Sequence, residues 1–156
     1  MAAGRAKLDA ALAECALHAQ VLGDAVAALP SEFSAATVVN VDADRRRWLD
    51  QAAYRFMKLQ DSLGEKVLPG LLAATLDPLP PEATFAERLH RLERLGALPS
   101  VERWRLLREV RNSLAHEYPE HPGLQAAALT RLVGGARELL LIWAAAHAFA
   151  GRRLPG

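Results

Sequence analysis

The sequence predicts an all-α protein, an up-and-down bundle of four long helices and one short helix. Hydrophobic residues make up 51% of the 156 positions, and many recur at alternating spacings of three and four, as on one face of a helix. The β-branched and aromatic residues that favour strands are sparse. The length is that of one domain, so residues 1–156 are predicted to form a single helical domain.

The first predicted helix carries an apolar stripe from Leu8 to Leu29, and Pro30 stops it. Cys15 lies inside this stripe and is expected to be a small core residue, because an unpaired buried thiol packs like a hydrophobe. The connector that follows contains T-V-V-N-V, a pattern compatible with a short strand. One isolated strand has nothing to pair with, so a loop is the better prediction.

A second helix is predicted to begin at Asp42 or Asp44, either of which can act as its N-cap. Its first turn contains three consecutive arginines, 45–47, which we expect to be a solvated helix start, with a nucleic-acid contact as the alternative. Its apolar stripe continues to about residue 71. Pro69 interrupts this stripe, and a proline inside a helix removes a backbone hydrogen bond, so a bend is predicted there.

The second half of the chain is predicted to contain three more helices. A proline-rich turn at 77–81 precedes a short helix from about Thr84 to Leu95, which Gly96 ends. Ser100 can cap the next helix, which is predicted to run to Tyr118. The last helix is predicted to span about 124–150, and its Gly134-Gly135 pair is expected to let another helix approach closely.

Charge and cysteine content limit the possible functions. Nineteen basic and eighteen acidic residues give a net charge of +1, which excludes a strong global nucleic-acid signature but permits a local basic cleft. One cysteine excludes an internal disulfide and a cysteine-rich zinc site. The sequence shows no signal peptide, and the apolar run 139–150 is shorter than the roughly 20 residues of a membrane span, so a cytoplasmic protein without a membrane segment is expected.

The octapeptide R-N-S-L-A-H-E-Y, residues 111–118, is the candidate functional motif. If the helix continues through it, Arg111 falls inside the apolar stripe of the helix. A guanidinium there must either extend to the rim or lie beside an anion. Asn112 and His116, four residues apart on the polar side, would let the amide orient the imidazole by a hydrogen bond.

Together these side chains supply an anion clamp, a group that titrates near neutrality and a hydroxyl. Cleavage of RNA needs a base for the 2′-OH proton, an acid for the leaving 5′-oxygen and a cation for the charge on phosphorus. The acidic residues form no recognisable metal-ligand cluster in the sequence, and no Gly-rich phosphate loop or G-x-S-x-G motif occurs. The pattern therefore favours metal-independent phosphate chemistry over metal-dependent hydrolysis.

The octapeptide resembles the R-x4-6-H motif of the HEPN superfamily, with Arg111, Asn112 and His116 at the motif positions. With Tyr118 in the last place, the R-x4-H-x-Y form is similar to that of the HepT-like toxins. The segment R-F-M-K-L-Q-D-S-L-G, residues 55–64, also resembles an earlier core helix of this group.

This resemblance implies a homodimeric, metal-independent endoribonuclease without a cofactor, the toxin of a toxin-antitoxin pair. It implies that Arg111 and His116 are catalytic and that Asn112 supports them. It also implies a minimal nucleotidyltransferase as the antitoxin partner, which neutralises the toxin by transferring AMP to Tyr118.

The spacing of the motif gives a separate argument for a dimer. Five residues along an ideal helix separate Arg111 and His116 by about 140° and about 7.5 Å, so they do not share one face. One chain also offers a single motif histidine, whereas both an acid and a base must act. A two-fold dimer would bring in a second copy of each group. On the same continuous helix, Tyr118 would lie two turns beyond Arg111, about 10.5 Å along the axis.

Two other functions remain open at this stage. The chain could be a non-catalytic binding module that docks a nucleotidyltransferase or presents its substrate, or a helical dimer with only a scaffold role. Other histidines and the tryptophans are expected to be structural, at the surface, in the core or at a dimer interface: His18, His90, His121, His147, Trp48, Trp104 and Trp143.

Overall fold

A computed structural model describes residues 2–75, 79–116 and 118–154, and within these residues the protein is helical and contains no strand. The predicted all-α class is therefore confirmed. The elements, in chain order, are α1 (Ala2–Ala27), α2 (Ala35–Val38), α3 (Ala43–Ser62), the π-helical segment η1 (Leu63–Val67), α4 (Leu68–Ala73), α5 (Phe85–Leu95), α6 (Val101–Ser113) and α7 (Pro122–Arg153).

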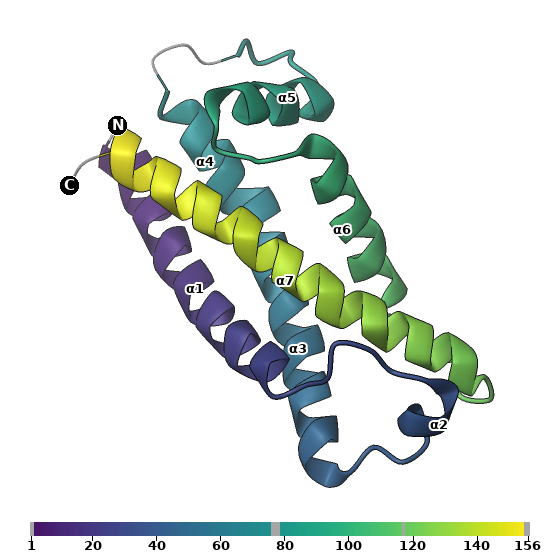
Figure 1. The fold of residues 1–156 in the computed structure, drawn as a ribbon. Coiled ribbons are helices and arrows are strands. Elements are labelled where there is room, and N and C mark those ends of the chain that lie inside the picture. Colours follow the sequence, from purple (N-terminus) through teal and green to yellow (C-terminus); the bar gives the residue numbers. More distant parts are fainter. Residues whose placement is uncertain (1, 76–78, 117, 155–156) are drawn as a thin grey trace.

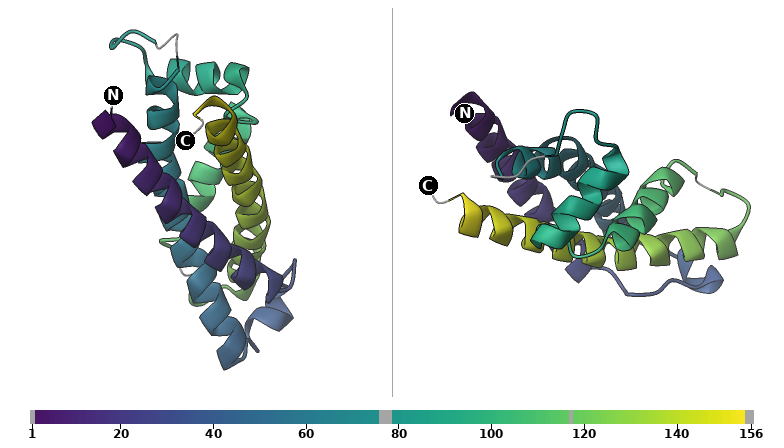
Figure 2. Two further views of the ribbon diagram at one scale, coloured as in Figure 1. Left: turned by 90° about the vertical axis from the view of Figure 1, so that its left-hand side faces the viewer. Right: turned by 90° about the horizontal axis from the view of Figure 1, so that it is seen from above.

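The long segments run in alternating directions, and α1 and α7 lie along one side of α3 (Figure 1). Helix α5 lies across the end of the molecule at which α4 ends, and α2 packs against α7 at the opposite end (Figures 1 and 2). The two ends of the described chain are close together, since the Arg5 guanidinium donates from Nη2 to the carbonyl oxygen of Leu154 at 2.9 Å. The C-terminal end of α6, where the octapeptide begins, lies away from the termini (Figure 1).

The core is built from the predicted apolar stripes. Cys15 has no exposed surface, as expected, and burial raises the pKa of its thiol to about 12. Trp104 and Trp143 are also buried, whereas Trp48 keeps 36% of its surface exposed. The predicted caps at Asp42 and Ser100 are confirmed, since each side chain accepts from a backbone N–H group in the first turn of its helix. Thr84 caps α5 in the same manner, which was not predicted.

Gly96 ends α5 in the left-handed conformation at φ 85°, as predicted. Part of the predicted proline-rich turn, residues 77 and 78, lies outside the described residues.

The predicted loop after the first helix is wrong at one place, because residues 35–38 form the short helix α2. Ser34 and Thr37 make a reciprocal capping box, in which each side chain accepts from the backbone N–H of the other. These two hydrogen bonds satisfy the backbone N–H groups of Ser34 and Thr37 and so stabilise a single helical turn. The spacing of apolar residues does not reveal such a short turn. Val38 of this turn is buried, so α2 is anchored to the body of the protein.

The interruption predicted at Pro69 takes the form of a π-helical segment just before it. The backbone N–H of Leu68 donates to the carbonyl of Leu63, five residues back. Proline has no N–H to continue the α-helical ladder, and the wider turn accommodates that missing donor. The helix then continues as α4.

Two glycines set the position of α6 against its neighbours. A side chain at Gly64 would come within 3.0 Å of the buried Trp104 ring, and one at Gly135 within 3.3 Å of Leu107. The close helix approach predicted at the glycine pair is therefore confirmed for Gly135. It is wrong for Gly134, where an added side chain would meet nothing within 4 Å.

Helix α7 is longer than predicted, and its length and hydropathy would allow it to cross a membrane. Core helices pass the same test, and α7 contributes buried residues such as Leu139, Trp143 and Phe149 to the core. One such helix is weak support for a membrane span.

Candidate functional site

Helix α6 ends at Ser113, five residues before the predicted end at Tyr118. The Ser113 hydroxyl donates back to the carbonyl of Val110 at 2.7 Å, which offers the last turn an alternative to the helical ladder. Pro119 also disfavours the right-handed helical conformation at the residue before it. Tyr118 instead has φ 48°, in the left-handed region.

The early helix end corrects the geometry expected for the motif. The 140° separation of Arg111 and His116 and the two-turn offset of Tyr118 assume a continuous helix, which does not exist beyond Ser113. The predicted pairing of Asn112 with His116 is also wrong. Both residues are exposed, and no hydrogen bond joins them in the described part of the chain.

Arg111 lies beside an anion, one of the two alternatives that the sequence allowed. Its Nε donates to Oδ1 of Asp61 at 3.2 Å and its Nη2 donates to Oδ2 at 3.0 Å. Both side chains are about one third exposed. A two-point contact between a planar guanidinium and a carboxylate fixes orientation as well as position.

The charge of Asp61 makes the electrostatic potential at the Arg111 guanidinium more negative. Its hydrogen bonds raise the pKa of the Arg111 guanidinium above the ordinary value, and the charge of Glu65 acts in the same direction. Arg108 lies at the edge of this cluster, with its Nη1 3.9 Å from Oδ1 of Asp61. The cluster therefore joins α6 to α3 and holds two arginines at the surface.

His116 and Tyr118 line a groove of about 630 Å³ between α2, the first turns of α3 and the beginning of α7. The side chains around them are mostly apolar, with a few polar and charged groups among them. The groove is lined by Val38, Val39, Val41, Arg46, Leu49, Asp50, Ala53, Ser113, Leu114, His116, Tyr118, Pro119, Gln125, Ala128, Leu129 and Leu132.

Tyr118 is held in its unusual conformation by the start of α7. Its carbonyl oxygen accepts from Nε2 of Gln125 at 2.7 Å and from the backbone N–H of His121 at 3.1 Å. A non-glycine residue in the left-handed region is strained, and such strain persists only where neighbouring contacts impose it. The rings of His116 and Tyr118 are 6.0 Å apart between centroids, so the two residues form one edge of the groove.

The four predicted site residues therefore lie at two separate places in the structure. Arg111 is held by Asp61, Asn112 is exposed at the helix end, and neither lines the groove that His116 and Tyr118 share. Sequence reasoning missed Asp61, although an anion near Arg111 was one of its two alternatives. For the arginine run 45–47 it expected a solvated helix start, with a nucleic-acid contact as the alternative. The Arg46 side chain is exposed, and it lines the groove.

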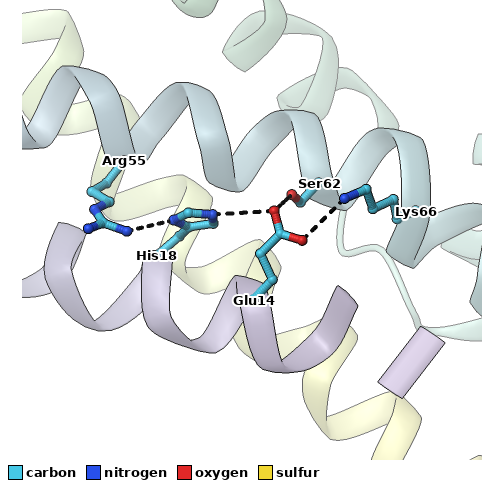
Figure 3. A network of polar contacts seen from close by, with 5 residues as sticks. All are labelled: Glu14, His18, Arg55, Ser62 and Lys66. Atoms are coloured by element: carbon cyan, nitrogen blue, oxygen red, sulfur yellow. Dashed lines mark hydrogen bonds and ion pairs between the residues drawn. The ribbon is translucent and has the colours of Figure 1, made fainter. Parts of the chain in front are cut away.

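A second polar cluster lies between α1 and α3, around His18 (Figure 3). The Arg55 guanidinium donates from Nη1 to Nδ1 of His18 at 2.9 Å. Glu14 accepts from the Ser62 hydroxyl at 3.0 Å and from Lys66 at 3.2 Å, and its Oε1 lies 3.6 Å from Nε2 of His18. His18 is 7% exposed, so it is a structural core histidine, as expected.

The partners of His18 select one protonation state. Because Arg55 has no acceptor, Nδ1 must be unprotonated, which leaves the proton on Nε2, facing Glu14. Burial lowers the pKa of His18 below 6.5, the positive charges of Arg55 and Lys58 act in the same direction, and Glu14 opposes them. The imidazole is therefore kept neutral.

The remaining histidines show no shared arrangement. His90, His121 and His147 are exposed, and His147 stacks on Trp143 with 5.0 Å between ring centroids. Among the residues that the structure describes, no three histidine, cysteine or acidic side chains gather as metal ligands would.

Comparisons with known proteins identify no relative. No family model matches the chain, and neither the curated proteins nor the solved structures contain a match. Function must therefore be argued from the residues themselves.

Proposed function

We propose that this protein is a metal-independent endoribonuclease of the HEPN type, active as a homodimer and serving as the toxin of a toxin-antitoxin pair. One observation carries the proposal. Within one short segment, an arginine is oriented by a two-point contact with Asp61, and a histidine stands exposed at the edge of a groove. These are the cation and the titratable group that RNA cleavage requires.

The proposed reaction is an internal transfer at phosphorus. A neutral His116 accepts the proton of the ribose 2′-OH, and the 2′-oxygen forms a bond to phosphorus. The bond from phosphorus to the 5′-oxygen breaks, and that oxygen receives a proton from an imidazolium. The products are a 2′,3′-cyclic phosphate and a 5′-OH, while Arg111 stabilises the negative charge on the pentacoordinate phosphorus.

The proposal requires two copies of the chain. Arg111 is not among the residues that line the His116 groove, and one chain supplies one motif histidine for two proton transfers. An isologous dimer in which the α6 ends meet would place His116 and Arg111 of each copy near those of the other. Asn112, exposed beside Arg111, is proposed to support substrate binding at that junction.

One observation favours an alternative function, a non-catalytic module that docks a nucleotidyltransferase or presents its substrate. Asp61 compensates the charge of Arg111 in the single chain, which reduces its attraction for phosphate. In this alternative the chain cleaves no RNA, and the motif serves for nucleotide or phosphate contact. Removal of Arg111 would then weaken that contact and the ion pair between α6 and α3.

The two functions are separated by a cleavage assay on the purified chain. We expect cleavage of single-stranded RNA in excess EDTA, with cyclic or 3′-phosphate ends and no cleavage of DNA of the same sequence, because attack comes from the 2′-OH. Activity that disappears on chelation and returns with Mg²⁺ or Mn²⁺ would contradict the mechanism. Growth arrest on expression of the chain alone would favour the enzyme over the module.

Tyr118 is proposed as the residue at which a partner nucleotidyltransferase controls activity by transferring AMP. Its position beside His116 gives this a physical basis, since an adenylate on the tyrosine would occupy the groove edge and bring negative charge there. Co-expression with the enzyme, followed by mass spectrometry of the Tyr118 peptide, should show added AMP. Equal neutralisation of a Tyr118→Phe chain would show that inhibition is by binding alone.

A further inference from the structure

The groove beside His116 contains two charged side chains of opposite sign that the proposed chemistry does not use. Arg46 and Asp50 both line it, one turn apart on α3. Both side chains are exposed, and neither side chain has a hydrogen bond or ion pair within the part of the chain that the structure describes. Elsewhere in the first turn of α3, Arg47 is paired with Asp44 at 2.7 Å. Arg46 and Asp50 are thus free to contact a ligand.

We propose that this groove binds a guanine base of single-stranded RNA and that Asp50 reads it. The proposal rests on the proposed ribonuclease function, which supplies the class of ligand. The base would enter the groove beside α3, where the Asp50 carboxylate would accept hydrogen bonds from N1–H and the 2-amino group, and Arg46 would contact a neighbouring phosphate.

The walls of the groove suit a flat aromatic ligand. Its apolar side chains come from α2, α3, the α6 end and α7, and include Val39, Leu49 and Leu129. The Tyr118 ring stands at one edge, where a base can stack on it. Single-stranded RNA is recognised in this manner, by unstacked bases that contact aromatic and apolar side chains and are read on their Watson–Crick edges.

The choice of guanine follows from the hydrogen-bonding capacity of a carboxylate, which only accepts. Guanine presents two adjacent donors on its Watson–Crick edge. Adenine and cytosine each place an acceptor next to their amino group, and uracil places its single donor between two acceptors. Only guanine can therefore donate to both oxygens of Asp50 without facing an acceptor.

Binding of uncleavable oligonucleotides tests this proposal apart from catalysis. The probes are fluorescent uridine-rich RNAs with 2′-O-methyl groups and a single guanine, or the same strand with inosine, which lacks only the 2-amino group. With the full chain we expect guanine to bind about tenfold more tightly than inosine, within the range for a two-point base contact. Equal affinities would overturn the proposal.

The variants Asp50→Asn and Asp24→Asn remove the same charge, but Asp24 is exposed on α1 and does not line the groove. Asp50→Asn should abolish the preference for guanine over inosine, and Asp24→Asn should keep it. Arg46→Gln should weaken binding of both probes equally, unlike Arg45→Gln, which changes a neighbouring arginine outside the groove. A preference that survives Asp50→Asn would overturn the proposal.

Failure of this proposal is distinguishable from failure of the proposed ribonuclease. If the chain cleaves ordinary RNA without regard to guanine and shows no preference between the probes, the enzyme stands and the guanine site is overturned. If it prefers the guanine probe but cuts no RNA, the groove reads guanine as proposed and the catalytic assignment fails.

Discussion

His18 and His116 are the same residue type in opposite settings. His18 lies 7% exposed between two helices, with a cation on one ring nitrogen and a carboxylate near the other (Figure 3). His116 lies exposed beyond the end of α6, with the Tyr118 ring as its neighbour. His18 therefore has a structural role in the fold, whereas His116 is accessible to a ligand.

The polar contacts of a histidine, and not its residue type, therefore decide whether it can exchange a proton with a substrate. Both ring nitrogens of His18 face charged groups from its own chain, and its proton is fixed by them. His116 can accept or donate a proton without breaking such a network. Arg55 and Arg111 differ in the same manner, since Arg55 binds the buried imidazole while Arg111 binds Asp61 at the surface.

The largest expected effect comes from removing the exposed histidine. His116→Ala and Arg111→Ala should each lower the RNA cleavage rate at least about 100-fold, since each removes a contact made in the transition state. The helical content and dimer should persist, because His116 is exposed and lies outside the helix, and Arg111 is about one third exposed in the last turn of α6. Initial rates and circular dichroism measure both. A folded His116→Ala chain that cleaves like wild type would end the catalytic assignment.

A smaller effect is expected from releasing Arg111 without removing it. Asp61→Asn keeps the size of the side chain but loses the charged two-point contact, so the guanidinium is less well oriented. Cleavage should fall roughly tenfold, because a small displacement of a catalytic group is costly. Glu65→Gln is the matched control, since Glu65 acts on Arg111 only through space. An increase in cleavage would instead mean that Asp61 withholds Arg111 from the substrate.

The buried histidine should affect stability and leave cleavage intact. His18→Ala leaves Arg55 without its acceptor, and the free energy of unfolding should fall by about 1–3 kcal/mol. His147→Ala, at an exposed position, should change it by at most about 0.5 kcal/mol. Urea denaturation measures both changes. Similar losses in the two variants would show that the His18 contacts contribute nothing specific.

The smallest expected effect is a pH dependence of stability that comes from His18. The pKa of His18 is lowered in the folded state, so the unfolded chain binds more protons below the ordinary value of 6.5. Its contribution to stability is fully present above that value and is lost as the pH falls below it. Wild type should therefore lose stability between pH 7 and 5.5, and His18→Gln should lose less. An unchanged loss in His18→Gln would refute the assignment.

Local sequence determined most of the helices. Apolar spacing gave the stripes around Cys15 and Phe56, and side chains such as Asp42 and Ser100 marked helix starts because they satisfy backbone donors a few residues away. These interactions operate over three or four residues, so they can be read from the chain. The same patterns also located the octapeptide and limited Arg111 to two settings, at the rim or beside an anion.

Only the tertiary structure decided what surrounds the site. Asp61 lies fifty residues from its partner Arg111, and their meeting depends on how Gly64 and Gly135 let α6 approach its neighbours. The His116 groove likewise depends on the end of α6 at Ser113 and on α2 packing against α7. Periodicity cannot reveal such contacts, because they arise from the packing of whole helices. The sequence therefore determined which groups are present, and packing decided which of them face each other.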